Sequence, residues 1–168
     1  MKSDSLHGPR LLTQDDDLTA FDCGVTSLNH YLAGRAYSDQ QAGKSRTYVA
    51  TRHDRVVGYF SVAAASIEPS DATERAAKGQ GVQQIPAVLI GRLAVDKTVQ
   101  GQGMGEALLV EALRKSAAAA ETIGARAVLV DALDEGARNF YAKLGFEASP
   151  SNPLHLMMLM KDVRKTLG

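Results

Sequence analysis

A row of glycines offers the clearest chemistry in this chain. Gly101, Gly103 and Gly105 follow an apolar segment and precede a long helical pattern. Glycine lets backbone amides approach a ligand without a Cβ atom in the way. The amides and the dipole at the start of a helix favour phosphate oxygens. The pattern therefore predicts a site that binds a pyrophosphate.

Two other phosphate-binding motifs fit the residues less well. A dinucleotide fingerprint has the form G-x-G-x-x-G, and here the third glycine comes one residue too early. The tripeptide Gly-Lys-Ser at 43–45 looks like the end of a P-loop. However, Ser38 stands where that loop needs its first glycine, and a strand pattern follows where it needs a helix. We therefore expect neither of these motifs to be functional.

Two segments resemble signatures of the GNAT family of N-acetyltransferases. Gln100–Gly105 matches the family's Q/R-x-x-G-x-G/A turn. Asn139–Phe146 resembles the tyrosine-containing segment, closed by Gly-Phe, that ends the catalytic half of the family fold. It follows the turn at the distance that the family's order requires. Two matching motifs at the correct spacing are a stronger indication than either one.

The resemblance implies one α/β domain over residues 1–168, with a mixed central sheet flanked by helices and a splayed cleft between the fourth and fifth strands. It also implies acetyl-CoA as the co-substrate and no metal. The residues expected to bind acetyl-CoA are Leu93, Ala94, Val95, Gln100, Gly101, Gln102, Gly103, Met104, Gly105 and Asn139.

Tyr141 is the proton donor that the family resemblance implies. Acetyl transfer passes through a tetrahedral intermediate and expels a thiolate. The ordinary pKa of a phenol, about 10, is close to that of an alkyl thiol, so proton transfer between them wastes little driving force. A backbone amide on the fourth strand is expected to hold the carbonyl oxygen as negative charge develops.

The sequence indicates no general base. The four histidines are expected to lie at the surface, outside the family's catalytic positions, and a water chain is expected to deprotonate the amine. They are His7, His30, His53 and His155. No cluster of metal-ligating residues is evident.

A narrower resemblance, over residues 11–160, is to the toxin branch of this family in type II toxin–antitoxin systems. The segments that carry it are Phe21–Gly24, Leu28–Leu32, Gly43–Val49, Ile90–Val95, Ala120–Gly124 and Phe146–Pro150. That branch acetylates the α-amine of aminoacyl-tRNA, which arrests translation, and a ribbon-helix-helix antitoxin neutralises it. The resemblance therefore implies both partners, and a homodimer is a further expectation.

The composition limits how such a chain binds tRNA. Its formal net charge is zero, so no overall charge attracts nucleic acid and binding must depend on a local patch. Five cations in the middle of the chain are expected to form a phosphate-binding rim beside the cleft. They are Lys44, Arg46, Arg75, Lys78 and Arg92.

Bulk properties favour a cytoplasmic globular protein. The 168 residues suit one domain, and 45% apolar with 23% charged residues is ordinary for a globular chain. Cys23 is the only cysteine, so no internal disulfide forms, as fits a reducing compartment. We see no signal peptide and no apolar run near the roughly 20 residues of a membrane helix.

Apolar spacing predicts the elements around these sites. Helices are expected at 27–42, capped by Thr26 or Ser27, at 104–122, ended by Gly124, and at 135–144, capped by Asp134. Strands are expected in a hairpin at 47–63, at 85–95, at 127–133, from 146 and at 156–160, with a strand or extended segment at 11–22. Residues 68–84 are expected to form a mobile loop with one helical turn at 72–77.

Two alternatives remain open at this point. The same chemistry can act on another amine, such as a protein N-terminus, a polyamine or a drug. The chain can instead be a catalytically silent acyl-CoA-binding or repressor module, although the presence of Tyr141 argues against this. Growth arrest on expression, relieved by Tyr141→Phe, distinguishes the toxin from both.

Overall fold

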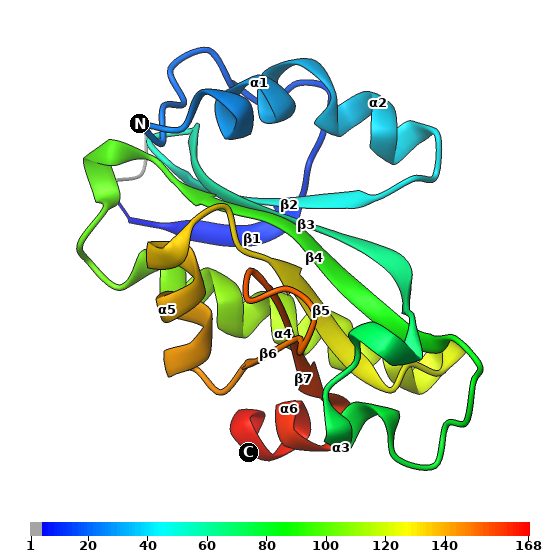
Figure 1. Ribbon diagram of the computed structural model, residues 1–168. Helices are drawn as coiled ribbons and strands as arrows, with labels where there is room; N and C mark the ends of the chain where they lie inside the picture. Colours follow the sequence, from blue (N-terminus) through cyan, green and yellow to red (C-terminus); the bar gives the residue numbers. More distant parts are fainter. Residues whose placement is uncertain (1–4) are drawn as a thin grey trace. The chain divides into compact units, whose positions relative to one another are not determined.

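The computed structural model describes residues 5–168 and has a mixed α/β fold (Figure 1). Its elements in chain order are β1 (His7–Leu11), α1 (Thr26–Gly34), α2 (Ala36–Gln41), β2 (Arg46–Arg52), β3 (Arg55–Ile67), α3 (Glu74–Ala77), β4 (Ile85–Val95), α4 (Met104–Ile123), β5 (Ala127–Asp131), α5 (Glu135–Lys143), β6 (Glu147–Ala148), β7 (His155–Leu159) and α6 (Met160–Leu167). Short 3₁₀ helices lie at Pro69–Asp71 and Lys97–Val99.

The strands form one sheet in the order β1-β2-β3-β4-β5-β7-β6. β4 pairs with β5 in parallel, from Ala87 opposite Ala127 to Ile90 opposite Val130. The neighbouring pairs β1–β2, β2–β3, β5–β7 and β6–β7 are antiparallel. The predicted mixed sheet is therefore confirmed, whereas the splayed cleft between the fourth and fifth strands stays a prediction.

The chain divides into two compact units. Unit 1 holds the residues up to Ala63 together with Arg92–Ala112, and unit 2 holds Ala64–Gly91 together with Leu113–Gly168. The glycine turn belongs to unit 1 and Tyr141 to unit 2. That residues 1–168 form one domain stays a prediction.

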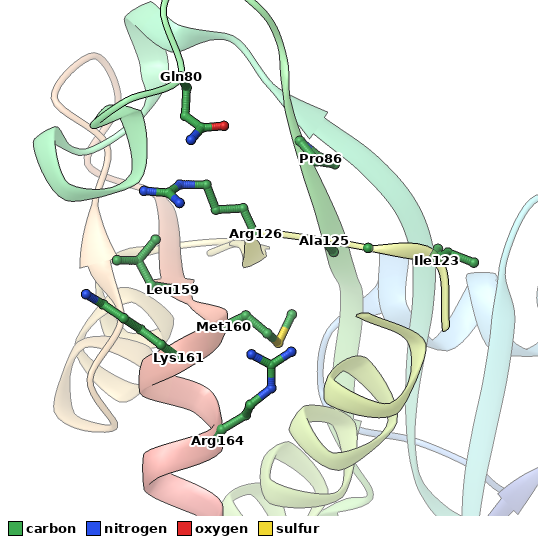
Figure 2. A pocket seen from close by; sticks show the side chains of 10 residues that line it. Gln80, Pro86, Ile123, Ala125, Arg126, Leu159, Met160, Lys161 and Arg164 are labelled. Atoms are coloured by element: carbon green, nitrogen blue, oxygen red, sulfur yellow. The ribbon is translucent and has the colours of Figure 1, made fainter. Parts of the chain in front are cut away.

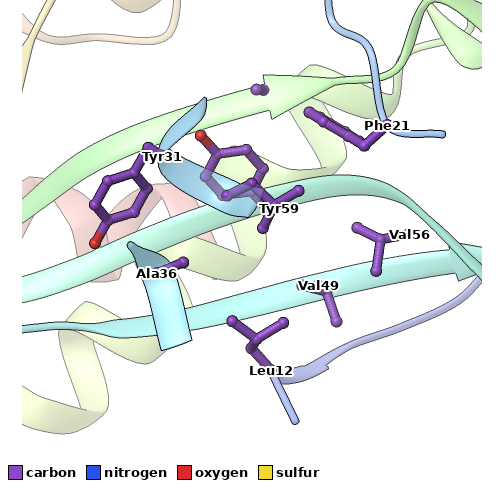
Figure 3. Packing of buried hydrophobic residues seen from close by; sticks show 9 residues of the cluster. Leu12, Phe21, Tyr31, Ala36, Val49, Val56 and Tyr59 are labelled. Carbon is purple, nitrogen blue, oxygen red and sulfur yellow. The ribbon is translucent and has the colours of Figure 1, made fainter. Parts of the chain in front are cut away.

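The core of unit 1 joins its two N-terminal helices to the β2–β3 hairpin (Figure 3). Val49 and Tyr59 are direct partners in the β2–β3 ladder and share one face of it. A register shift between Ala50 and Thr51 brings Val56, three residues before Tyr59, into the same core. Tyr31 and Ala36 from α1 and α2 pack onto them. The hairpin was predicted at this place, and its turn residues at 53 and 54 have φ angles of 53° and 60°, as a tight two-residue turn requires.

The N-terminal predictions need two corrections. The helix expected at 27–42 is broken at Arg35, whose φ of −131° is not helical. The N-cap residue of α1 is Val25, not Thr26 or Ser27 as predicted. The strand expected at 11–22 ends at Leu11 instead. Beyond that strand the Asp16 carboxylate binds the Arg10 guanidinium and the Thr13 amide, and these bonds favour a turn.

Unit 2 differs from prediction mainly at its C-terminus. The strand at 155–159 runs directly into helix α6, which the apolar pattern did not indicate. Met160 and Val163 are its buried residues, and the remaining surface is largely charged. The helices ended by Gly124 and capped by Asp134 are confirmed, as is the helical turn in the segment 68–84.

Candidate active site

A buried carboxylate fixes the chain between β4 and the glycine turn. Asp96 is 2% exposed and accepts hydrogen bonds from the amides of Asp22 (2.8 Å) and Thr98 (2.9 Å) and from the Thr98 hydroxyl (2.7 Å). Burial raises the pKa of Asp96, but these hydrogen bonds lower it by more, so the net shift is downward. Asp96 therefore holds the turn as a carboxylate, a role that the sequence prediction missed.

Replacing Asp96 with alanine is expected to destabilise the fold by about 1–3 kcal/mol for each amide left unsatisfied. Asp96→Asn should destabilise the fold by less. Its loss in free energy of unfolding relative to wild type should become smaller as the pH falls. The folded-state pKa is depressed, so the carboxylate's contribution is complete above the unfolded value of about 4 and is lost as the pH falls through the folded value. Urea unfolding from pH 3 to pH 7 measures this. Asp15→Ala, at an exposed position, is the control, and equal losses for the two alanine variants would contradict the assignment.

The side chain of Gln100 also holds the glycine turn in place through hydrogen bonds to the main chain. Its Nε2 donates to the carbonyl oxygens of Val95 (2.8 Å) and Cys23 (3.0 Å). Both amide hydrogens of this side chain are thus used within the protein. The sequence prediction made Gln100 a ligand of acetyl-CoA, and the structure gives its side chain a scaffolding task as well.

The glycines of the turn leave room for a ligand. Gly101 and Gly103 have φ angles of +77° and +80°, and a Cβ atom added to either would meet no other atom within 4 Å. Helix α4 begins at Met104, and the amides of its first turn have no acceptor within the helix. Open backbone at the start of a long helix fits a diphosphate, and a pocket of about 320 Å³ is partly lined by Gln102, Gly103 and Met104.

Tyr141 lies in unit 2 on helix α5, which Asp134 caps by accepting from the amide of Ala137 (2.8 Å). The Tyr141 side chain is 7% exposed and makes edge contacts with the rings of Phe140 and Phe146. Burial raises the pKa of Tyr141 to about 12, and the negative charge of Asp131 adds to the effect. The phenol is therefore held in its protonated form, as a proton donor must be.

A histidine–carboxylate pair accompanies this tyrosine. His155 at the start of β7 lies opposite Asp131 at the end of β5, and Nδ1 of the histidine is 2.5 Å from Oδ1 of the aspartate. The sequence prediction placed all four histidines outside catalytic positions. The pairing of β5 with β7 unites two residues that are far apart in the chain, and no spacing pattern signals this.

The predicted cationic rim is spread over both units. Lys44 and Arg46 are exposed, and the Arg92 guanidinium lies 3.6 Å above the ring of Tyr31. Arg75 is held by Glu147 (2.8 Å) and Asp162 (2.9 Å), which balance its charge. Lys78 is exposed. That these residues bind tRNA stays a prediction.

A basic pocket of about 570 Å³ in unit 2 was not foreseen (Figure 2). Arg126, Lys161 and Arg164 contribute to its lining, and among the described residues no carboxylate does. Three backbone carbonyls between 75 and 78 hold the Arg126 guanidinium, but no acidic side chain neutralises it in the described part of the chain. The pocket, defined by these three cations, is suited to an anion.

The family model described as "Acetyltransferase (GNAT) domain" matches residues 43–148, more than half of the chain. The protein belongs to the GNAT acetyltransferase family. This GNAT chain is accordingly an acetyl-CoA-dependent N-acetyltransferase, and the glycine turn and Tyr141 lie within the matched segment.

Relatives of this GNAT enzyme lie in the toxin branch, as the narrower resemblance predicted. The tRNA-acetylating toxin of Mycobacterium tuberculosis is 44% identical over 160 residues, which cover 95% of this chain and 96% of the toxin. AtaT complexed with acetyl-methionyl-tRNAfMet has a TM-score of 0.86 at 29% identity, over 98% and 99% of the two chains. A mutant of AtaT bound to the C-terminus of the antitoxin AtaR and acetyl-CoA has a TM-score of 0.80 at 29% identity, over 96% of each chain.

Two features are absent from residues 5–168. No group of three or more histidine, cysteine or acidic side chains in this range is arranged to hold a metal ion. No helix in the same range combines the length and apolar character needed to cross a membrane.

Proposed function

We propose that this GNAT enzyme transfers acetyl from acetyl-CoA to the α-amine of aminoacyl-tRNA and thereby blocks translation. The name of the Mycobacterium relative, which matches this chain along almost its whole length, supports this acceptor. So does the similarity to AtaT in complex with an acetylated aminoacyl-tRNA. A cytoplasmic location follows, because charged tRNA and ribosomes are there.

The two units have separate tasks in this proposal. In unit 1 the amides of Gly101, Gly103 and the first turn of α4 bind the diphosphate of acetyl-CoA, and the main chain of Leu93–Val95 binds the pantetheine arm. In unit 2 Asn139 adds a contact, and Tyr141 protonates the departing thiolate. The observation that carries the chemistry is the buried phenol of Tyr141, held protonated on a capped helix.

The partners extend the same proposal. A mutant of AtaT binds the C-terminus of the antitoxin AtaR, and we propose that a ribbon-helix-helix antitoxin neutralises this enzyme in turn. We further propose, from the resemblance to the toxin branch alone, that the enzyme forms a homodimer. The polyanionic substrate requires cations around the acceptor end. Lys44, Arg46 and Arg92 in unit 1 supply some of these, and the basic pocket of unit 2 offers further positive charge.

Reversing charge in the basic pocket is expected to weaken tRNA acetylation without weakening acetyl-CoA binding. Lys161→Glu with Arg164→Glu should lower kcat/KM for charged tRNA at least tenfold in low salt, because contacts with phosphates release counterions on binding. The effect should fade as salt increases. Lys165→Glu, on the same helix but outside the lining, is the control. An unchanged kcat/KM in the double variant would remove the pocket from the tRNA surface.

Acetylation of total charged tRNA with radiolabelled acetyl-CoA, followed by mass spectrometry of the released amino acids, tests the function. The expected product is an N-acetyl amino acid from one or a few tRNA species. Transfer to polyamines or peptide N-termini, with none to charged tRNA, would establish a different acceptor. Binding of acetyl-CoA without transfer to any amine would indicate a silent binding module.

A further inference from the structure

The pair formed by His155 and Asp131 has the geometry of a proton acceptor. A carboxylate can only accept a hydrogen bond, so at 2.5 Å Nδ1 of His155 carries the hydrogen and Oδ1 of Asp131 receives it. In the neutral ring this leaves the lone pair on Nε2. Within the described chain no other group binds the ring of His155, and its side chain is 24% exposed. Nε2 therefore has no partner within the described residues.

Main-chain hydrogen bonds hold the pair in place, and Asp131 is near enough to Tyr141 for its charge to act on the phenol. Asp131 and His155 are direct partners in the antiparallel β5–β7 ladder, and the His155 main chain bonds to both Asn152 and Ser149. Helix α5 packs against β7, and the charge of Asp131 reaches Tyr141. The acid candidate and the histidine pair thus share the carboxyl end of β5 in unit 2.

Two carboxylates on the adjoining segments are engaged elsewhere. Glu147 on β6 pairs with Arg75, and the Asp71 carboxylate accepts from the Ser151 hydroxyl. Asp131 on β5 and Tyr141 on α5 are the groups on adjoining elements whose contacts and charge link them to this site. The Asp131 carboxylate keeps the ring in one orientation while Nε2 accepts a proton.

We infer that His155, oriented by Asp131, accepts the proton that the α-ammonium of the substrate must lose before its nitrogen attacks the thioester. This inference rests on the proposed function. His155 is then a catalytic residue and Asp131 a positioning residue. The assignment supplies the general base for which the sequence offered no candidate.

The proton and electron balance closes without another reactant. Nε2 removes one proton from the ammonium, the freed lone pair forms the N–C bond, and the C–S bond breaks with its electron pair going to sulfur. Tyr141 gives its proton to that sulfur. The nitrogen's second proton passes through solvent to restore Tyr141, and His155 releases its proton to solvent. The net reaction frees one proton for each acetyl group transferred from acetyl-CoA to an ammonium.

The variant His155→Asn isolates the reacting nitrogen. Its amide nitrogen can replace Nδ1 in the bond to Asp131, but nothing replaces Nε2. Single-turnover transfer to total charged tRNA at pH 6.5 should fall about 100-fold or more, with the Kd for acetyl-CoA unchanged. The deficit should shrink as the pH rises above about 8, where an α-amine loses its proton unaided. Asp131→Asn should show the same trend with a smaller loss.

Matched variants make the result decisive. His30→Asn, on the exposed surface of α1, should behave as wild type throughout the series. If His155→Asn lowers the Tm, His155→Gln is measured in its place. Wild-type rates in the His155 variant, or a deficit that is equal at every pH, would overturn the base assignment. Failure of the wild-type enzyme to acetylate charged tRNA would instead overturn the proposed function, so the two failures are distinguishable.

Discussion

Tyr141→Phe is expected to reduce acetyl transfer by about 100- to 10,000-fold, the usual range for loss of a general acid. The phenylalanine ring keeps the edge contacts with Phe140 and Phe146, so the fold should survive. Acetyl-CoA affinity should also persist, because the proposed diphosphate site, the glycine turn, belongs to unit 1. Single-turnover rates with charged tRNA, beside calorimetric binding of acetyl-CoA, measure both quantities.

The pH dependence adds a second expectation for Tyr141. Since burial and Asp131 raise its pKa to about 12, the phenol keeps its proton through pH 10. Wild-type activity should therefore show no alkaline loss due to this residue between pH 7 and pH 10. Phe140→Leu is the control for Tyr141→Phe, because it alters the packing around Tyr141 but keeps the phenol. It should retain most of the acetyl-transfer rate. Full activity of Tyr141→Phe would show that solvent protonates the thiolate.

Gly103→Val is expected to raise the Kd for acetyl-CoA at least tenfold. The backbone at this position has a φ of +80°, which a β-branched side chain adopts only with strain. Its Cβ would point into space that no protein atom occupies, where the ligand is expected. Calorimetry with acetyl-CoA measures the change.

Gly124→Val separates ligand binding from backbone strain. Gly124 has a φ of +82° and equally open surroundings, but it lies at the other end of α4. Both variants should lose stability by about 1–2 kcal/mol. Only Gly103→Val should lose affinity, and an equal effect on acetyl-CoA binding in both would remove the diphosphate from the turn.

Local sequence patterns predicted the helix ends and the hairpin turn, because neighbouring residues determine these features. Glycine placement and a capping aspartate marked the ends of α4 and α5 correctly, and the polar turn of the hairpin fixed its position. The break at Arg35 lay outside such patterns, because apolar residues on both sides of it pack into one core. Helix α6 was missed since only two of its residues are buried.

The residues of the candidate site were apparent from the sequence to different degrees, for the same reason. The glycine turn and Tyr141 occur in contiguous motifs, which a single sequence displays. The pairing of His155 with Asp131 depends on strand register, and the anchoring of Asp96 depends on a loop more than 70 residues earlier in the chain. Such contacts depend on the tertiary structure, and no local pattern in a single sequence predicts them.

The bonds around Asp22 also connect the N-terminal segment to the glycine turn, where we propose that acetyl-CoA binds. The amide of Asp22 binds Asp96, its carbonyl accepts from the Lys97 amide, and the next carbonyl, of Cys23, binds Gln100. A ligand that stiffens the glycine turn therefore also stiffens residues 22–23. Thermodynamic linkage is reciprocal, so a protein that binds residues 22–23 is expected to change the affinity of the enzyme for acetyl-CoA.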